Sequence, residues 1–315
     1  MTLTIGVDIG GTKIAAGVVD EEGKVVADAR RESPAQHPDA IADSIAEMVA
    51  ELRAGHEVAA VGLAAAGFVD LAGEEIMFAP NLAWRDEPLR RLVADRIDLP
   101  TAMDNDANAA AWAEYRFGAG QGARTLLLAA IGTGIGGGLV VAGDVFRGGF
   151  GAAAEFGHMR VVPNGRLCAC GLHGCWEAYG SGTGLTARAR ELAQQDPASA
   201  AVMLELAGGD PHDILGPMVS EAADRGDAAA KQSFAELAHW IGEGLASLGS
   251  ILDPDVILIG GGVSESEELD LGVIVSSFRA AESGIAYRPV PDIKLAELGN
   301  QAGLIGAADL AREAL

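Results

Sequence analysis

Positive charge is scarce in this sequence of 315 residues. Lys and Arg together number 22 against 45 Asp and Glu, which gives a formal net charge of −23. A surface this acidic repels a phosphate backbone instead of exchanging counterions with it. We therefore expect no nucleic acid as a partner.

Cysteines and long hydrophobic runs are also few. The three cysteines all lie within residues 168–175, and this odd, local set cannot form a disulfide framework. We therefore expect the protein to be located in the reducing cytoplasm. No basic leader precedes Asp8, the first charged residue, so we expect no secretory signal. The uncharged run 125–143 contains six glycines, which favours strand, turn and strand over a membrane span. We expect no membrane partner.

Glycine is abundant, with 43 residues or about 14% of the chain, twice the usual share. At roughly 150 residues per domain, the length predicts about two domains. Hydrophobic periodicity predicts an alternating α/β chain. The expected strands are 3–7, 14–19, 25–26, 58–64, 101–103, 126–131, a strand that follows the glycine turn 132–138 and ends at 141, and 256–259. The expected helices are 41–52, 89–97, 234–248 and about 302–315.

Two glycine-rich turns resemble each other. Residues 7–13 read VDIGGTK and residues 132–138 read GTGIGGG, and a shift of 121 residues places Gly11-Thr12 on Gly132-Thr133. This short match suggests a duplicated fold. Glycines let backbone amides approach an anion, Thr12 can add a hydrogen bond, and Asp8 can hold a hydrated Mg²⁺. A tight hairpin without a ligand is the alternative for the first segment.

The second turn also satisfies the GxGxxG pattern of dinucleotide-binding folds. That pattern requires a helix immediately afterwards, whereas residues 138–144 are apolar without helical spacing. A hairpin is therefore favoured. Two β-turn-β loops facing each other would clamp the tail of a nucleoside triphosphate, as a kinase with a sugar or acid acceptor requires.

Acidic and amide side chains gather where a short strand meets an Ala-rich helix. Asp104, Asn105 and Asp106 occupy this junction, and Asn105 or Asp106 could simply cap the helix. In the functional interpretation, a carboxylate kept ionised by the helix N-terminus accepts the proton of an attacking hydroxyl. Asp106 is the candidate general base.

A metal site is predicted by four soft ligands within eighteen residues, namely His158, Cys168, Cys170 and Cys175. Three thiolates and an imidazole complete a tetrahedral zinc shell with no open position, so the zinc would be structural. Free cysteines and a core histidine are the alternative. Glu155 and Glu177 flank the cluster and could be turned toward a shared cleft, or could simply be exposed acids.

Taken together, the motifs resemble those of the ROK sugar kinases over essentially the whole chain. They are DIGGTK, PNLAW at 80–84, NDANAAA at 105–111, the glycine loop, EFGH and CxCGLHGCWE. The resemblance implies an actin-like ATPase fold, with two ribonuclease-H-like domains and a cleft between them. It implies a small domain of residues 1–106 plus about 300–315, and a large zinc-carrying domain of residues 107–299.

Within this family the sequence is most similar to bacterial glucokinases, which implies transfer from Mg²⁺-ATP to the 6-hydroxyl of glucose. Asp106 would be the base, and Asp106 would also contact the sugar together with Gly67, Asn81, Asn105, Glu155, His158 and Glu177. The phosphates and adenosine would be bound by Asp8, Gly10, Gly11, Thr12, Lys13, Thr133, Gly134, Gly261 and Gly262. A homodimer or homotetramer is implied as well.

Several alternatives belong to the same resemblance. Kinases for mannose, fructose and N-acetylhexosamines share most of these motifs, and a sugar-sensing protein without catalysis is the rival from another class. Ala66 stands where many relatives carry Pro before the glycine of the sugar-side loop. Family repressors carry a helix-turn-helix domain ahead of DIGGTK, whereas seven residues precede Asp8 here, so we expect no DNA-binding part.

Overall fold

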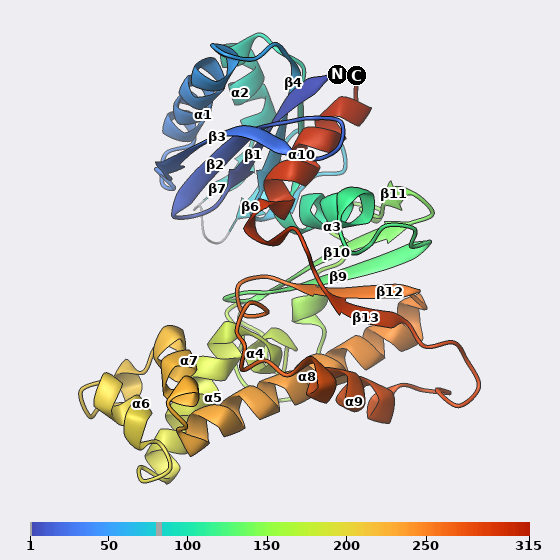
Figure 1. Ribbon diagram of the computed structural model, residues 1–315. Helices are drawn as coiled ribbons and strands as arrows, with labels where there is room; N and C mark the ends of the chain where they lie inside the picture. The colour runs from blue at the N-terminus through green and yellow to red at the C-terminus, as the bar shows by residue number, and fades with distance from the viewer. Residues whose placement is uncertain (1, 80–83) are drawn as a thin grey trace. The chain divides into compact units, whose positions relative to one another are not determined.

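The computed structural model describes residues 2–79 and 84–315 (Figure 1). Contacts along the chain divide it into two units. Unit 1 comprises Met1–Leu128, Gly137–Ala154 and Ala296–Leu315, and unit 2 comprises Ala129–Gly136 and Glu155–Leu295. Within the described residues, no helix combines the length and apolarity needed to cross a bilayer.

The central sheet of unit 1 has the strand order β3-β2-β1-β4-β8. The first three strands form an antiparallel meander, and β4 and β8 continue it in parallel with β1. Their bounds are β1 Leu3–Ile9, β2 Lys13–Val19, β3 Val25–Glu32, β4 Val58–Ala65 and β8 Thr101–Asn105. The predicted strands are confirmed in place, but β3 and β8 run six and two residues beyond the predicted ends at 26 and 103, because their pairing with β2 and β4 continues to Glu32 and Asn105.

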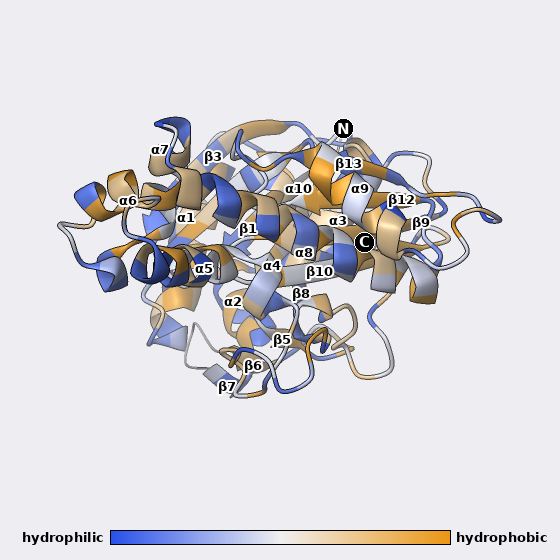
Figure 2. Ribbon diagram, turned by 90° about the horizontal axis from the view of Figure 1, so that it is seen from below, coloured by the Kyte–Doolittle hydropathy of each residue, from blue (hydrophilic) through white to orange (hydrophobic). Residues whose placement is uncertain are grey.

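Helices cover both faces of this sheet. On one face, α1 (Pro38–Arg53) and α2 (Leu89–Ile97) bury apolar residues against the strands in one continuous core. Figure 2 shows hydrophilic and hydrophobic colour on α1, as expected for an amphipathic helix. The other face is covered by α10 (Ala302–Glu313), which packs against β1, β4 and α3 (Asp106–Phe117).

Glycine allows α10 to approach the sheet backbone closely. A methyl group on Gly6 would lie 1.8 Å from the carbonyl oxygen of Leu304, and one on Gly62 would lie 1.8 Å from that of Ala307. The Thr4 hydroxyl adds a buried hydrogen bond of 2.8 Å to the Ala308 carbonyl. These glycines therefore serve packing, although they lie inside strands where glycine is usually unfavourable.

A second sheet repeats the topology of the first, with the order β11-β10-β9-β12-β13. Its strands are β9 Thr125–Ile131, β10 Ile135–Val141, β11 Asp144–Val145, β12 Val256–Gly260 and β13 Asp292–Leu295. In both sheets the first two strands along the chain have seven residues each and are joined by a three-residue turn. The predicted duplication is thereby confirmed, and residues 125–143 form strands and not a membrane span.

Unit 2 is mainly helical outside its strand segments. Its helices are α4 Glu177–Gly180, α5 Gly182–Gln195, α6 Ala201–Leu206, α7 Gly216–Asp224, α8 Ala228–Leu252 and α9 Leu271–Ala281. The stripe predicted around residues 234–248 is buried on α8 and confirms the prediction. Trp176 is fully buried, and its indole N–H donates to the Trp240 carbonyl of α8 at 2.7 Å.

A small antiparallel sheet in unit 1 was not predicted from the sequence. It comprises β5 Phe68–Val69, β6 Ile76–Ala79 and β7 Trp84–Glu87. The domain division after residue 106 stays a prediction, and the contact-based units differ from it. They keep α3 with unit 1 because α3 packs on α10.

Candidate active site and metal centre

The first glycine turn joins β1 to β2 in unit 1. Gly10 donates its amide to the Lys13 carbonyl at 3.0 Å, so the turn is tight, and Thr12 and Lys13 are exposed. Asp8 lies near the end of β1 with Gly303 of α10 beside its carboxylate. Partial burial raises the pKa of Asp8, and the Lys13 ammonium opposes this shift. Mg²⁺ prefers oxygen ligands such as the Asp8 carboxylate, and its charge would favour the ionised form of Asp8.

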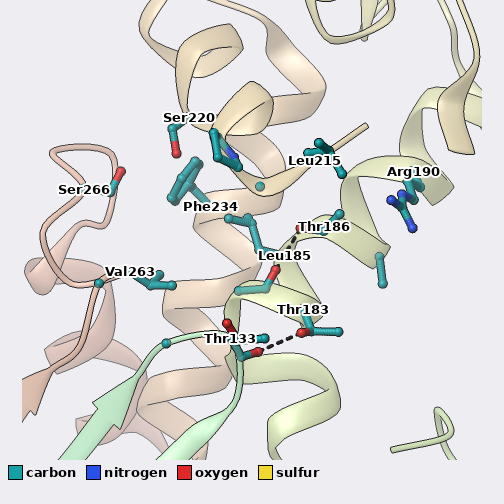
Figure 3. A pocket seen from close by; sticks show the side chains of 16 residues that line it. Thr133, Thr183, Leu185, Thr186, Arg190, Leu215, Ser220, Phe234, Val263 and Ser266 are labelled. Carbon is teal, nitrogen blue, oxygen red and sulfur yellow. Dashed lines mark hydrogen bonds between the residues drawn. The ribbon is translucent and has the colours of Figure 1, made fainter. Parts of the chain in front are cut away.

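The second glycine turn, residues 132–134, is fastened to the start of α5 in unit 2. Gly182 donates its amide to the Gly132 carbonyl at 2.9 Å. Thr183 donates its hydroxyl and its amide to the Thr133 carbonyl, at 2.7 and 3.2 Å (Figure 3). The turn and the start of α5 therefore form one corner, which the Gly182 and Thr183 amides and the Thr183 hydroxyl hold together.

A cavity of 630 Å³ lies beside this corner within unit 2. Its walls come from α5, from the start of α7 and from the segment after β12, and the buried Phe234 of α8 also lines it (Figure 3). Arg190 of α5 donates from Nε and Nη2 to the Ile214 carbonyl, at 3.0 and 2.8 Å, which ties the wall containing Leu215 to α5. The volume is that of a small-molecule site.

Two of the predicted nucleotide residues in unit 2 line this cavity, Thr133 and Gly262. The other two turn toward protein: a methyl group on Gly134 would meet the Glu177 carboxylate, and one on Gly261 would meet the Ile131 carbonyl. The cavity walls at residues 182–190 and 215–220 were not predicted from the sequence. The run Ser-Gly-Thr-Gly at 181–184, in which Ser181 caps α5, was a usable signal for the start of a helix.

Asn105 caps α3 in unit 1, as the capping interpretation predicted. Its side-chain oxygen accepts from the amides of Ala107 and Asn108, at 2.9 and 3.1 Å. Its amide group donates to the Gly67 carbonyl and to Asp106 Oδ1, both at 3.0 Å. Asp106 Oδ1 also accepts from the Ala107 amide at 2.9 Å. The structure thus brings Gly67, Asn105 and Asp106 together, whereas Asn81 lies outside the described residues.

Glu177 connects the metal cluster with the second glycine turn. Its Oε2 accepts from the Ile135 amide at 3.1 Å, and the Cys168 thiol donates to its Oε1 at 3.4 Å. Glu155 lies near enough for its pKa to respond to both His158 and Glu177. Loss of water around Glu155 raises this pKa most, His158 lowers it, and the Glu177 carboxylate raises it further. Glu155, His158 and Glu177, the three residues of unit 2 that were predicted to contact the sugar, therefore lie close together.

The four predicted zinc ligands converge. Their ligand atoms lie within 4.8 Å of one another, with Cys170 Sγ 3.7 Å from Cys175 Sγ and Cys168 Sγ 3.8 Å from His158 Nδ1. A tetrahedron with Zn–S bonds of about 2.3 Å requires ligand atoms about 3.8 Å apart. Burial raises the pKa of the Cys168 thiol to about 12, and a bound cation would favour its thiolate form. Donor set and spacing fit zinc.

Comparison with known proteins identifies the family. The family model described as "ROK family" matches residues 4–314, and the chain therefore belongs to the ROK family. Its fold is the actin-like ATPase fold of these sugar kinases, a mixed α/β fold with two domains.

The sequence is 50% identical to the glucokinase of Streptomyces coelicolor over 313 residues, 99% of this chain and 98% of that protein. Among solved structures, it is similar to a ROK family glucokinase from Streptomyces griseus in complex with glucose and AMPPNP. That match has a TM-score of 0.88, 52% identity and 99% coverage of each chain. A ROK hexokinase from Thermus thermophilus matches with a TM-score of 0.83 and 33% identity over 100% of both chains.

Proposed function

We propose that this chain is an ATP-dependent glucokinase, which transfers the γ-phosphoryl group of Mg²⁺-ATP to the 6-hydroxyl of glucose. The observation that carries the proposal is the likeness, over 99% of each chain, to a glucokinase solved with glucose and AMPPNP. The glycine corner with its cavity supports the nucleotide half, and the hydrogen-bonded Asp106 at the start of α3 supports the sugar half.

Asp106 acts as the general base. As the bond between the sugar O6 and the γ-phosphorus forms and the bond from that phosphorus to the β-phosphate oxygen breaks, the hydroxyl proton passes to the Asp106 carboxylate and ADP leaves. The two hydrogen bonds to Oδ1 fix the plane of this carboxylate before substrate arrives. Such preorganisation lowers the entropy lost in reaching a reactive geometry.

The sugar hydroxyls are assigned to Asn105, Asp106, Glu155, His158 and Glu177, with Gly67 and Asn81 on the sugar-side loops. His158 presents Nδ1 to the cysteine cluster, so its other ring nitrogen is the one assigned to a hydroxyl. Polar groups that hydrogen-bond ring hydroxyls discriminate strongly against analogues that leave them unpaired.

The cavity beside Thr133 holds the adenosine, with the turns at 132–134 and 10–13 serving the phosphates. When bound, Mg²⁺ supplies charge neutralisation on the phosphates, and Asp8 would hold it. The zinc bound by His158, Cys168, Cys170 and Cys175 is structural and fixes the segment that ends at Glu177. Because the thiols must stay reduced and ATP is the donor, we assign the enzyme to the cytoplasm, as a homodimer or homotetramer.

A coupled assay for ADP production with glucose, ATP and Mg²⁺ tests this proposal. A kinase forms ADP in proportion to glucose consumed. A sugar-sensing protein would bind glucose, as measured by calorimetry, without forming ADP, and that result would refute the enzyme assignment. Light scattering of the same sample reports the oligomeric state.

A further inference from the structure

A buried carboxylate beside the candidate base has no role in the proposal above. Asp104 is the penultimate residue of β8, and its side chain is 7% exposed. A carboxylate buried to this extent is costly unless hydrogen bonds and a cation compensate it. Its partners therefore indicate what it does.

One oxygen of Asp104 accepts hydrogen bonds from Asn105, which precedes Asp106, and from Asn108, two residues beyond Asp106. Asp104 Oδ1 accepts from the backbone amide of Asn105 at 2.8 Å and from the side-chain amide of Asn108 at 2.9 Å. Asn105 in turn holds Asp106 Oδ1 through its own side chain. A displacement of the Asp104 carboxylate would thus pass to Asp106 through one intervening residue.

The other oxygen of Asp104 is bound by a guanidinium from a distant part of unit 1. Arg147, two residues after β11, donates to Asp104 Oδ2 from Nε at 2.8 Å and from Nη2 at 2.6 Å. Its third nitrogen, Nη1, reaches the Val145 carbonyl at 3.4 Å. Both donors converge on one oxygen, so the planar guanidinium fixes the position of Oδ2 and neutralises the charge of the carboxylate. A lysine ammonium would neutralise the charge without this planar geometry.

We propose that Arg147, acting through Asp104, is a positioning residue for the general base Asp106. The inference rests on the proposed kinase function. Arg147 contributes no proton and touches no reacting atom. It holds Asp104, Asp104 holds the Asn105 backbone, and Asn105 holds the Asp106 carboxylate in the orientation that accepts the hydroxyl proton.

The test compares kcat and KM of Arg147→Met with those of a matched variant, Arg288→Met. Arg288 also pairs with a buried carboxylate, that of Glu282, whose side chain is 2% exposed, but it belongs to unit 2, whereas α3 belongs to unit 1. Per folded molecule, Arg147→Met is expected to lower kcat by about 10- to 100-fold, since misplacing a catalytic group by about 1 Å costs about 100-fold. The KM for ATP should change less than about threefold, because neither residue lines the nucleotide cavity.

An equal loss of kcat in both variants at equal loss of Tm would overturn the inference, because breaking any buried pair would then explain it. If Arg147→Met does not fold, Arg147→Lys decides, since it keeps the charge and loses the two-donor geometry. A kcat lowered about 3- to 10-fold at near wild-type Tm supports positioning, and a wild-type kcat overturns it. Absence of ADP formation by the wild-type protein would instead refute the proposed function itself.

Discussion

Asn105 uses both ends of its side-chain amide, and this decides how Asp106 is held. The oxygen caps α3, while the nitrogen binds both Gly67 and Asp106. Capping and catalysis were alternatives when only the sequence was considered. In the structure one side chain performs the capping and orients its neighbour for the proposed proton transfer, so the two interpretations are compatible.

At this residue scale, Asp106→Asn tests the base. The substitution keeps size and a hydrogen-bonding oxygen but removes the proton acceptor, so kcat should fall about 10²–10⁴-fold. Glucose affinity, measured by calorimetry, should change less than about tenfold. A matched control is Asp270→Asn, the same change at the N-cap of α9, which should leave kcat near wild type. Retention of more than about a tenth of kcat by Asp106→Asn would place the base elsewhere.

At the scale of elements, α10 and the central strands fit together through glycine. Leu304 and Ala307 place their carbonyl oxygens where methyl groups on Gly6 and Gly62 would be. These contacts join the last helix of the chain to two of its first strands, so the C-terminal residues complete the fold of unit 1.

Gly62→Ala should therefore destabilise the protein by about 1–3 kcal/mol, because the helix backbone must move to admit the methyl group. Gly55→Ala is the matched control: nothing lies within 4 Å of its added methyl, so stability should change by less than about 0.5 kcal/mol. Urea denaturation, monitored by tryptophan fluorescence, measures both. Equal midpoints for the two variants would contradict the packing argument.

We expect the segment between His158 and Glu177 to depend on a bound ion, because residues 159–176 contain no helix or strand beyond short turns and isolated bridges. Cys170→Ser should lose the zinc and disorder this segment, and should abolish glucose binding by releasing Glu177. The control His173→Gln alters the same loop at a residue outside the ligand set and should keep one zinc per chain. Elemental analysis decides: zinc-free wild-type protein that is fully active would refute the site.

At the scale of the whole molecule, we predict how the enzyme ranks different acceptor sugars. We expect the assigned polar residues to supply many partners for the ring hydroxyls of glucose. An N-acetyl group at C2 would need apolar room near His158 and Glu177, where a bound zinc would hold the segment rigid. We expect kcat/KM to rank glucose above mannose, and mannose above N-acetylated hexoses. An N-acetylhexosamine ranking ahead of glucose would change the assignment within the family but not the kinase activity.

Local patterns carried much of the prediction. The four predicted zinc ligands span eighteen residues, so their type and spacing predicted the cluster that the structure forms. The two hairpins and the buried stripe of α8 also follow from short-range periodicity. The roles of individual sugar and phosphate residues stay predictions, because the resemblance supplied them.

The sequence by itself predicted the two hairpins, the buried stripe of α8, a helix cap at Asn105 or Asp106, the clustering of one histidine with three cysteines, and the family, because each depends on neighbours along the chain or on short motifs. Only the tertiary structure decided which glycines serve packing and not turns, since Gly6 and Gly62 meet a helix that begins about 240 residues or more beyond them. It alone joined Arg147 to Asp104 and assembled the cavity beside Thr133 from α5, α7 and α8. Such contacts form when separately patterned elements pack together, and no periodicity along the chain records which partner each will meet.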